Sequence, residues 1–269
     1  MAFRKIFRIL KASVNSFKYL KNPLVIFKIP FNKNIKIIYK NGDVFEIKRN
    51  FFPSYLEIFE KFKYDGYWYK NNLKLKMSEP LVLKENFDDS YNIPGLEGKN
   101  ILDIGGLNGE SSIYFINEKK TKKVFVYEPI EKNYEYLLEN LKNNSIKNVF
   151  PYNIGVSNKN GNEIINSEYP PGSWGFGLPG NKYSINIKVE SWDTILEKHK
   201  KDNIYLAKVD CEGGERYLVE ANKELIKTIP NWVIETHSLE IEKNIIELFE
   251  KLGYKKINTK ARKTFHFEK

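Results

Sequence analysis

The sequence predicts an α/β protein in which a mostly parallel sheet is covered by helices on both faces. From residue 99 onward, short apolar segments alternate with amphipathic segments, as in repeated strand–helix–strand units. The first apolar segment leads directly into a glycine-rich turn, a junction typical of nucleotide-binding α/β folds. With 269 residues, of which 41% are hydrophobic, the chain is long enough to bury a full core.

Residues 1–97 are predicted to form a basic extension made of helices and a hairpin. Residues 3–21 carry apolar side chains at three- and four-residue steps and stop before Pro23, which indicates an amphipathic helix. The other elements expected in the extension are strands at 35–39 and 44–48, joined through the turn-forming Asn41-Gly42, and a helix at 53–63.

Residues 98–269 are predicted to form the nucleotide-binding domain. Its apolar segments predict strands at 100–104, 123–127, 149–154, 204–209 and 232–236, with a final antiparallel pair at 254–258 and 263–267. Its amphipathic segments predict helices at 109–118, 131–143, 191–200, 214–227 and 239–251. Residues 161–190 interrupt this alternation with an expected hairpin, 163–166 with 184–189. The hairpin encloses an aromatic, glycine-rich loop at 168–180. This loop either closes over a bound substrate or packs as an ordinary surface loop.

The formal charge of +10 comes from one segment. Residues 1–42 hold ten basic residues and no acidic one, so the rest of the chain carries 44 − 10 = 34 basic and 34 acidic residues. The basic segment could dock on the core or on a second subunit, lie on an anionic membrane, or hold RNA phosphates. Docking is the commonest role of an amphipathic helix. Between the other two roles, the continuous apolar stripe favours peripheral membrane contact through residues 3–21, and the balanced charge elsewhere makes nucleic acid a less favoured partner.

Several protein classes are excluded by composition. No apolar run is long enough for a bilayer-spanning helix, and a single cysteine, Cys211, excludes an intramolecular disulfide framework. The N-terminus lacks the pattern of a signal peptide. A cytoplasmic, at most membrane-peripheral, location is therefore expected.

The strongest local signal is the segment from Ile101 to Glu110. Gly105 suits the tight turn after the strand, while Gly106 and Gly109 allow close approach of a ligand and of the next helix. Nineteen residues after Gly109, a second strand ends in an acid that can accept hydrogen bonds from both ribose hydroxyls of an adenosine. The residues predicted to bind the nucleotide are Asp103, Gly105, Gly106, Asn108, Gly109, Glu128, Pro129 and Asn153.

The type of nucleotide follows from the first acid. A nicotinamide dinucleotide needs a glycine where Leu107 stands, and Asp103 would repel its pyrophosphate. S-adenosylmethionine has no phosphate and carries a positive sulfonium and ammonium, so a carboxylate suits it. Its own carboxylate could meet the N–H groups at the start of the next helix.

These residues resemble the FkbM family of S-adenosylmethionine-dependent methyltransferases. Four stretches are similar to family motifs: Asp103–Gly109 to D-x-G-A-N-x-G, with Leu107 in place of asparagine; Glu128-Pro129; Ser191–Ile195 to T-L-D-x-L; and Lys208–Glu215 to K-I-D-V-E-G-A-E. The resemblance implies a Rossmann-like class I methyltransferase fold with a seven-stranded sheet and a reversed last strand. It also implies O-methylation, often of a sugar hydroxyl in a glycan, glycolipid or natural product. The alternatives are an RNA methyltransferase that uses the basic segment, a non-catalytic subunit that binds S-adenosylmethionine, and a nicotinamide oxidoreductase.

The predicted catalytic residues follow later strands at the ligand edge. Asp210 is the first candidate to deprotonate or position the acceptor hydroxyl, although it could instead cap its own loop. His237 is the second candidate and Glu212 the third, while Glu215 is expected only to favour the dipole of its helix. Asp210, Glu212 and Glu235 could share a hard cation, but nothing in their spacing requires one and no metal is predicted.

Overall fold

A computed structural model of the chain describes residues 20–21, 34–38, 40, 42, 44–48, 52–78, 80–167, 180–261 and 263–269. The chain divides into two compact units, Met1–Glu85 and Asn86–Lys269. Residues 86–97, which the sequence assigns to the extension, lie with the second unit. The domain boundary expected after residue 97 stays a prediction.

The described residues of the first unit form two small sheets, an α-helix and a 3-10 helix. Strands β1 (Asn34–Ile38) and β2 (Val44–Lys48) pair antiparallel, and α3 (Phe52–Lys61) follows them, which confirms the predicted hairpin and helix. The sequence did not predict the next sheet, whose strands are β3 (Lys63–Tyr64), β4 (Trp68–Lys70) and β5 (Leu73–Leu75), followed by the 3-10 helix η2 (Pro80–Lys84). Strands of two or three residues are too short to display an alternating pattern. The predicted helix at 3–21 lies almost entirely outside the described residues.

The second unit is built on the predicted seven-stranded sheet. Its strands, in spatial order, are β14 (Lys255–Asn258), β15 (Thr264–Glu268), β13 (Asn231–Glu235), β12 (Ile204–Val209), β6 (Asn100–Ile104), β7 (Lys123–Tyr127) and β8 (Val149–Tyr152). Only β15 is reversed, pairing antiparallel with both β13 and β14. This arrangement confirms the Rossmann-like class I methyltransferase topology, including the reversed last strand.

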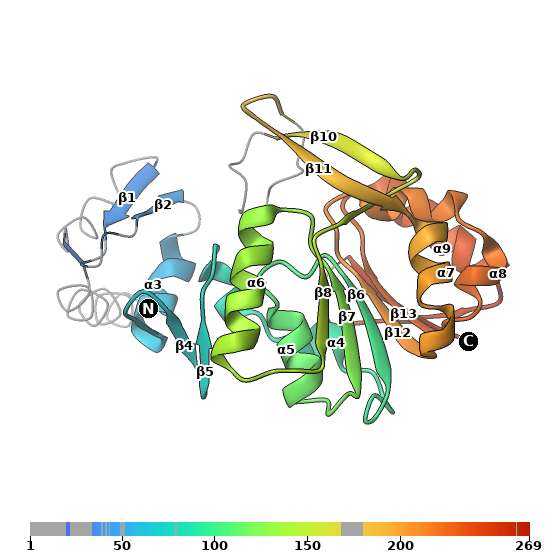
Figure 1. Ribbon diagram of the computed structural model, residues 1–269, viewed down its shortest axis with the longest axis horizontal. Helices are drawn as coiled ribbons and strands as arrows, with labels where there is room; N and C mark the ends of the chain where they lie inside the picture. Colours follow the sequence, from blue (N-terminus) through green and yellow to red (C-terminus); the bar gives the residue numbers. More distant parts are fainter. Residues whose placement is uncertain are drawn as a thin grey trace. The chain divides into compact units, whose positions relative to one another are not determined.

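Helices cover both faces of this sheet (Figure 1). Helices α5 (Glu110–Asn117) and α6 (Glu131–Asn143) lie on one face, and the short α4 (Phe87–Tyr91) packs on α5 through its Phe87 ring and Tyr114. The other face carries α7 (Trp192–Lys198), the 3-10 helices η3 (Lys200–Asp202) and η4 (Gly214–Glu220), α8 (Lys223–Ile226) and α9 (Leu239–Lys251).

One predicted helix is wrong in extent. The segment 214–227 is divided into η4 and α8, because Asn222 caps α8 with its side chain. The Asn222 side-chain oxygen accepts a hydrogen bond from the Glu224 N–H at 2.9 Å, and its backbone N–H donates to Asp193. Asparagine at a cap position starts a new helix here instead of continuing the previous one.

Side chains alternate between the faces of the central strands. Leu102, Ile104 and Val209 point toward α7–α9 and join a large core that includes Trp192 and Trp232. The side chains between them, Asp103 on β6 and Lys208 on β12, therefore point to the α5 side, where they are directly opposite each other in the strand register. The period of two along each strand thus places a charged pair inside the sheet layer.

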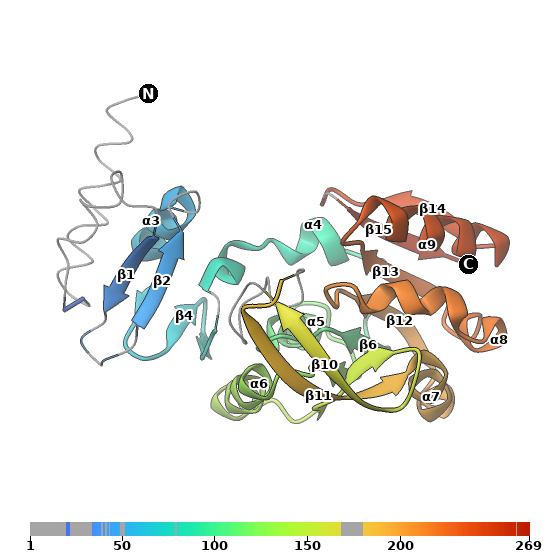
Figure 2. The same ribbon diagram turned by 90° about the horizontal axis from the view of Figure 1, so that it is seen from above.

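A separate three-stranded sheet follows β8. Strands β10 (Gly161–Ser167) and β11 (Tyr183–Ser191) form the predicted hairpin, and β9 (Gly155–Ser157), which was not predicted, pairs parallel with β11. The hairpin runs from the α7 side of the large sheet toward the α6 side (Figure 1 and Figure 2). Most of the predicted loop at 168–180 lies outside the described residues. Among the helices that the structure describes, none combines the length and apolar character needed to cross a membrane.

Gly105 brings the ends of β6 and β12 into backbone contact. It has a φ of +85°, and a Cβ at this position would lie 1.7 Å from the carbonyl oxygen of Asp210. The Asp210 N–H donates to the Ile104 carbonyl at 2.9 Å. Gly106 is constrained by a different neighbour, because a Cβ added to it would lie 2.1 Å from the side chain of Val126 on β7. Both glycines are therefore required by protein packing.

Replacing Gly105 by alanine should destabilise the protein by about 4 kcal/mol, since the new Cβ must displace backbone as well as adopt a left-handed φ. Gly253→Ala is a matched control, because Gly253 has nearly the same φ (+84°) but a Cβ added there would meet no atom within 4 Å. The control should lose only about 1 kcal/mol. Urea unfolding measures both values, and equal losses would contradict the packing argument.

Candidate functional site

The carboxyl ends of four parallel strands bring the predicted site residues to one edge of the sheet. The chain runs from β6 to β7 and β8 on one side, then returns to β12 and β13 on the other. Ligands of open α/β sheets bind at such a reversal of strand order. Glu128 follows β7, Asp210 follows β12 and His237 follows β13, so the sequence located this edge correctly.

Glu128 braces the glycine turn. Its Oε2 accepts a hydrogen bond from the Leu107 N–H at 2.9 Å, and its Oε1 accepts from the Ile130 N–H at 2.9 Å and from Asn133 at 3.2 Å. The residue is only 5% exposed, and burial raises its pKa to about 7 although these hydrogen bonds oppose the rise. Carboxylate oxygens accept more than one hydrogen bond each, so Glu128 retains capacity for ligand hydroxyls.

The backbone at Leu107 has a conformation that suits the asparagine of the family motif. Its φ is +48°, in the left-handed region that leucine adopts at a cost and asparagine adopts readily. The hydrogen bond from its N–H to Glu128 holds the turn in this conformation. The feature that this structure shows at position 107 is therefore a backbone conformation, and not a side-chain contact.

Asp103 and Lys208 form a buried ion pair beneath the turn. The Lys208 ammonium lies 3.0 Å from Asp103 Oδ1 and donates to the Gly105 carbonyl at 2.6 Å, while Ser111 and Ser112 each donate to Asp103 Oδ2 at 2.7 Å. Asp103 has no exposed surface. Burial alone would lower the pKa of Lys208, but the charges of Asp103 and Asp210 hold it well above its ordinary value.

The expectation that the Asp103 carboxylate faces a positively charged donor is therefore corrected. Strand alternation turns this side chain under α5, where Lys208 neutralises it. Asp103 can affect a ligand only indirectly, by pairing with Lys208, which donates a hydrogen bond to the carbonyl of Gly105 in the glycine turn.

Two predicted asparagines have different positions. Asn108 is fully buried, and its carbonyl accepts a hydrogen bond from the side chain of Asn140 on α6, so it orders the protein and is not exposed to a ligand. Asn153 is half-buried at the end of β8 and donates to the carbonyls of Glu128 at 2.9 Å and Pro129 at 3.2 Å. It thereby holds the turn that carries Glu128 and stays a candidate for donor contact.

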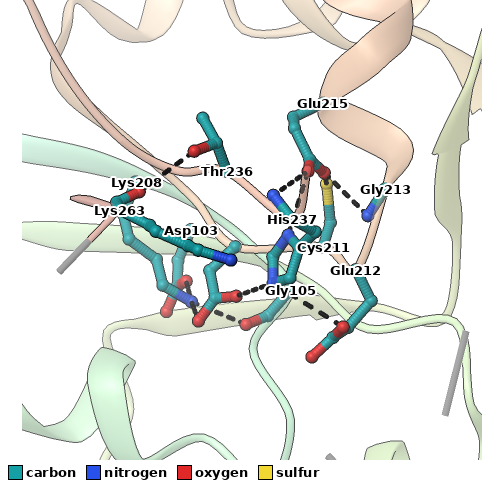
Figure 3. A network of polar contacts seen from close by, with 11 residues as sticks. Asp103, Gly105, Lys208, Cys211, Glu212, Gly213, Glu215, Thr236, His237 and Lys263 are labelled. Atoms are coloured by element: carbon teal, nitrogen blue, oxygen red, sulfur yellow. Dashed lines mark hydrogen bonds and ion pairs between the residues drawn. The ribbon is translucent and has the colours of Figure 1, made fainter. Parts of the chain in front are cut away.

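The other half of the site gathers Asp210, Glu212 and His237, and Figure 3 shows Glu212 beside His237. His237 Nε2 lies 3.6 Å from Asp210 Oδ1 and 3.6 Å from Glu212 Oε2, and all three side chains are partly exposed. The second oxygen of Asp210 lies 3.9 Å from the Lys208 ammonium, so this carboxylate bridges the two halves of the site. The structure therefore brings together all three predicted catalytic residues.

These three side chains also satisfy the spacing of cation ligands. Each offers one atom, and these atoms lie within 4.8 Å of one another. The set contains His237 where the sequence had suggested Glu235. The spacing would admit a divalent cation, and the same atoms would face a hydroxyl-bearing acceptor.

Sequence reasoning missed the role of Glu215. Glu212 and Gly213 have φ values of 51° and 110°, and this left-handed turn returns the chain so that Glu215 lies beside His237 (Figure 3). Glu215 Oε1 accepts hydrogen bonds from His237 Nδ1 at 2.9 Å and from the His237 N–H at 3.1 Å. No local pattern could have revealed this pair, because 22 residues and strand β13 separate its members.

The half of the site that contains Glu212 and His237 has shifted pKa values. Burial, with the charges of Asp210 and Glu215, raises the pKa of Glu212 to about 7. Burial would lower the pKa of His237, but the hydrogen bond and charge of Glu215, with the charges of Glu212 and Asp210, raise it to about 9. Below that pH, this half holds three carboxyl groups and one imidazolium.

Comparison with known proteins identifies the family. The family model of the methyltransferase FkbM domain matches residues 103–256, which is 154 of the 269 residues. Among curated proteins, no match was found.

Three solved structures illustrate the fold similarity. A methyltransferase FkbM from Methylobacillus flagellatus KT has 15% identity and a TM-score of 0.47, covering 82% of this chain and 59% of that chain. Wild-type Trm5b from Pyrococcus abyssi has 14% identity and a TM-score of 0.43, covering 87% and 57%. TrmK from M. capricolum, in complex with S-adenosylhomocysteine, has 14% identity and a TM-score of 0.38, covering 69% of each chain. This chain thus spans 59% of the length of the first of these structures.

Replacing Lys208 by methionine should destabilise the protein by about 3–5 kcal/mol, because it leaves the buried Asp103 carboxylate without its cation. The double variant Asp103→Asn/Lys208→Met should recover most of that loss, since both charges are then absent. Lys243→Met, at an exposed position of α9, is the control and should change stability by less than about 0.5 kcal/mol. Urea unfolding of the wild type and the three variants measures these differences. A double variant as unstable as Lys208→Met would contradict the pairing.

Proposed function

This chain belongs to the FkbM methyltransferase family, with S-adenosylmethionine as its methyl donor, and from this premise we propose that it methylates a hydroxyl group of an uncharged, sugar-like acceptor. The proposed acceptor is a glycan, a glycolipid or a related small molecule. The observation that carries the proposal is the cluster of Asp210, Glu212 and His237 at the carboxyl edge of the sheet.

The donor half fits S-adenosylmethionine. Glu128 is a buried carboxylate at the end of β7, with lone pairs available to the two ribose hydroxyls. The turn from Gly105 to Gly109 enters α5, whose first N–H groups suit a carboxylate. When bound, the donor supplies a methyl group that is already activated by a positively charged sulfur. The residues of this half hold and orient it, and Asn153 supports Glu128 from below.

The acceptor half suits hydroxyl groups better than phosphates. Asp210 and Glu212 present carboxylate oxygens that accept hydrogen bonds from hydroxyls, and with Glu215 they outnumber the single imidazolium of His237. A phosphate here would be repelled by this excess of negative charge. Asp210, or His237 in its neutral form, takes the hydroxyl proton, a contribution of roughly a hundred- to ten-thousandfold to rate.

Two alternative functions make different demands on the chain. RNA methylation would use the basic residues of segment 1–42, and it conflicts with the negative charge around Asp210 and Glu212. A non-catalytic subunit would need no group at the position of Asp210. The proposed setting is the cytosol, with residues 3–21 as the segment that would contact an anionic membrane surface.

The first experiment uses methyl-labelled S-adenosylmethionine and a host extract separated into lipid, glycan, RNA and protein fractions. We expect label in the lipid or glycan fraction. In Asp210→Asn, transfer should fall by roughly a hundredfold or more while donor binding is unchanged, because the carboxylate acts on the acceptor. Label confined to RNA would overturn the proposal. Full activity in Asp210→Asn would show that Asp210 has no role in the proposed methyl transfer.

Donor affinity should depend on pH through Glu128. Ribose hydroxyls donate to the ionised carboxylate, so binding requires the proton to leave a group with a pKa of about 7. Affinity should be constant above that pH and fall by up to about tenfold per unit below it. Calorimetric titration with S-adenosylhomocysteine measures this dependence. The Glu128→Gln variant should bind the ligand more weakly, and its affinity should no longer depend on pH. If the pH dependence is unchanged in this variant, a group other than Glu128 causes it.

A further inference from the structure

His237 differs from the other two histidines in the orientation of its ring. Both ring nitrogens of His199 are engaged inside the protein, with Asp202 at 2.8 Å and the Tyr127 hydroxyl at 2.9 Å. His266 is buried and contacts Asn231 at 3.1 Å. His237 instead has one nitrogen held in the protein and the other directed toward the partly exposed Asp210 and Glu212.

Glu215 is the group that holds the ring. It has no exposed surface, and its Oε2 accepts hydrogen bonds from the Gly213 N–H at 2.8 Å and from the Cys211 thiol at 3.6 Å. Its Oε1 accepts from both the backbone N–H and Nδ1 of His237. A single oxygen thus binds His237 at two points, which restricts both the position and the rotation of the imidazole.

This contact also selects the location of a proton on the ring. A carboxylate only accepts hydrogen bonds, so Nδ1 must carry a hydrogen to make the 2.9 Å contact. In the neutral imidazole the other nitrogen, Nε2, then carries a lone pair. At 3.6 Å, Nε2 is too far from Asp210 and Glu212 for a good hydrogen bond, so its lone pair can accept from a hydroxyl that lies beside these three side chains.

We propose that Glu215 is a positioning residue that holds His237 in the Nδ1–H form, so that Nε2 takes the proton of the acceptor hydroxyl. This inference rests on the methyl transfer proposed above and assigns the base within it. The acceptor oxygen forms a bond to the methyl carbon while the carbon–sulfur bond breaks and leaves its electron pair on sulfur. The hydroxyl proton passes to Nε2, and Glu215 stabilises the resulting imidazolium. The charged groups that face this ring are Asp210 and Glu212 from the loop after β12, and Glu215 from η4.

The first test reads the ring directly and needs no acceptor. Nitrogen NMR of the full chain, above the pH at which His237 loses its proton, reports which ring nitrogen carries hydrogen. We expect the Nδ1–H form in the wild type and a mixture of the two forms in Glu215→Gln, whose amide can donate as well as accept. Glu220→Gln, at the exposed end of the same η4, is the control and should match the wild type. An Nε2–H form in the wild type, or an unchanged ring in Glu215→Gln, would overturn the proposal.

The second test separates positioning from a purely structural role. In Glu215→Gln, kcat per folded molecule should fall roughly a hundredfold with donor affinity unchanged, and the pH–rate midpoint should move to lower pH. The direction follows because losing a negative charge beside His237 lowers its pKa. Glu215→Asp should restore part of the rate.

A double-variant cycle keeps the inference testable if Glu215→Gln is unstable. The pair Glu215→Gln/His237→Asn should be no slower than His237→Asn alone, because Glu215 acts through the ring. Wild-type kcat in His237→Asn, or an additive loss in the pair, would overturn the inference while methyl transfer itself stands. A wild type that transfers no methyl group would instead refute the proposed function, and the NMR result would still report on the pairing.

Discussion

Lys208 is a buried cation between two carboxylates that belong to different halves of the site. It lies 3.0 Å from Asp103 and 3.9 Å from Asp210, and it donates a hydrogen bond to the carbonyl of Gly105. A buried lysine is tolerated only where such partners compensate its charge. The ends of β6 and β12 are therefore held together by charge as well as by the close backbone approach at Gly105.

The two halves of the site differ in their electrostatic character. In the donor half, Asp103 is neutralised by Lys208 and buried under the glycine turn, which leaves Glu128 as the acid nearest to the expected ribose. In the acceptor half, charges alternate from Asp210 to His237 to Glu215, and the negative ones are in excess. The proposed cationic donor and uncharged hydroxyl acceptor are compatible with this distribution.

The fold could be predicted well wherever an element is long and regular. Strands β6, β7 and β12 and helices α6 and α9 have the predicted bounds, because each shows several repeats of its own period. Strands β3–β5 and β9 are too short to show one, and Asn222 interrupts a helix whose apolar pattern continues past it. The burial of the Asp103 and Asn108 side chains could not be predicted from the sequence. Motif spacing places a residue at an edge of the sheet but does not indicate the direction of its side chain.

The sequence by itself determined the family and the methyl donor, and it placed the candidate site residues at one edge of the sheet. These follow from local order: apolar periodicity, glycines at fixed spacing and an acid at the end of each strand. The tertiary structure alone decided which of those acids face a ligand and which are paired inside the protein. Parallel strands that are adjacent in the sheet but distant in the chain bring Lys208 to Asp103 and Glu215 to His237. Such pairings depend on strand order and register, which no segment of the sequence contains.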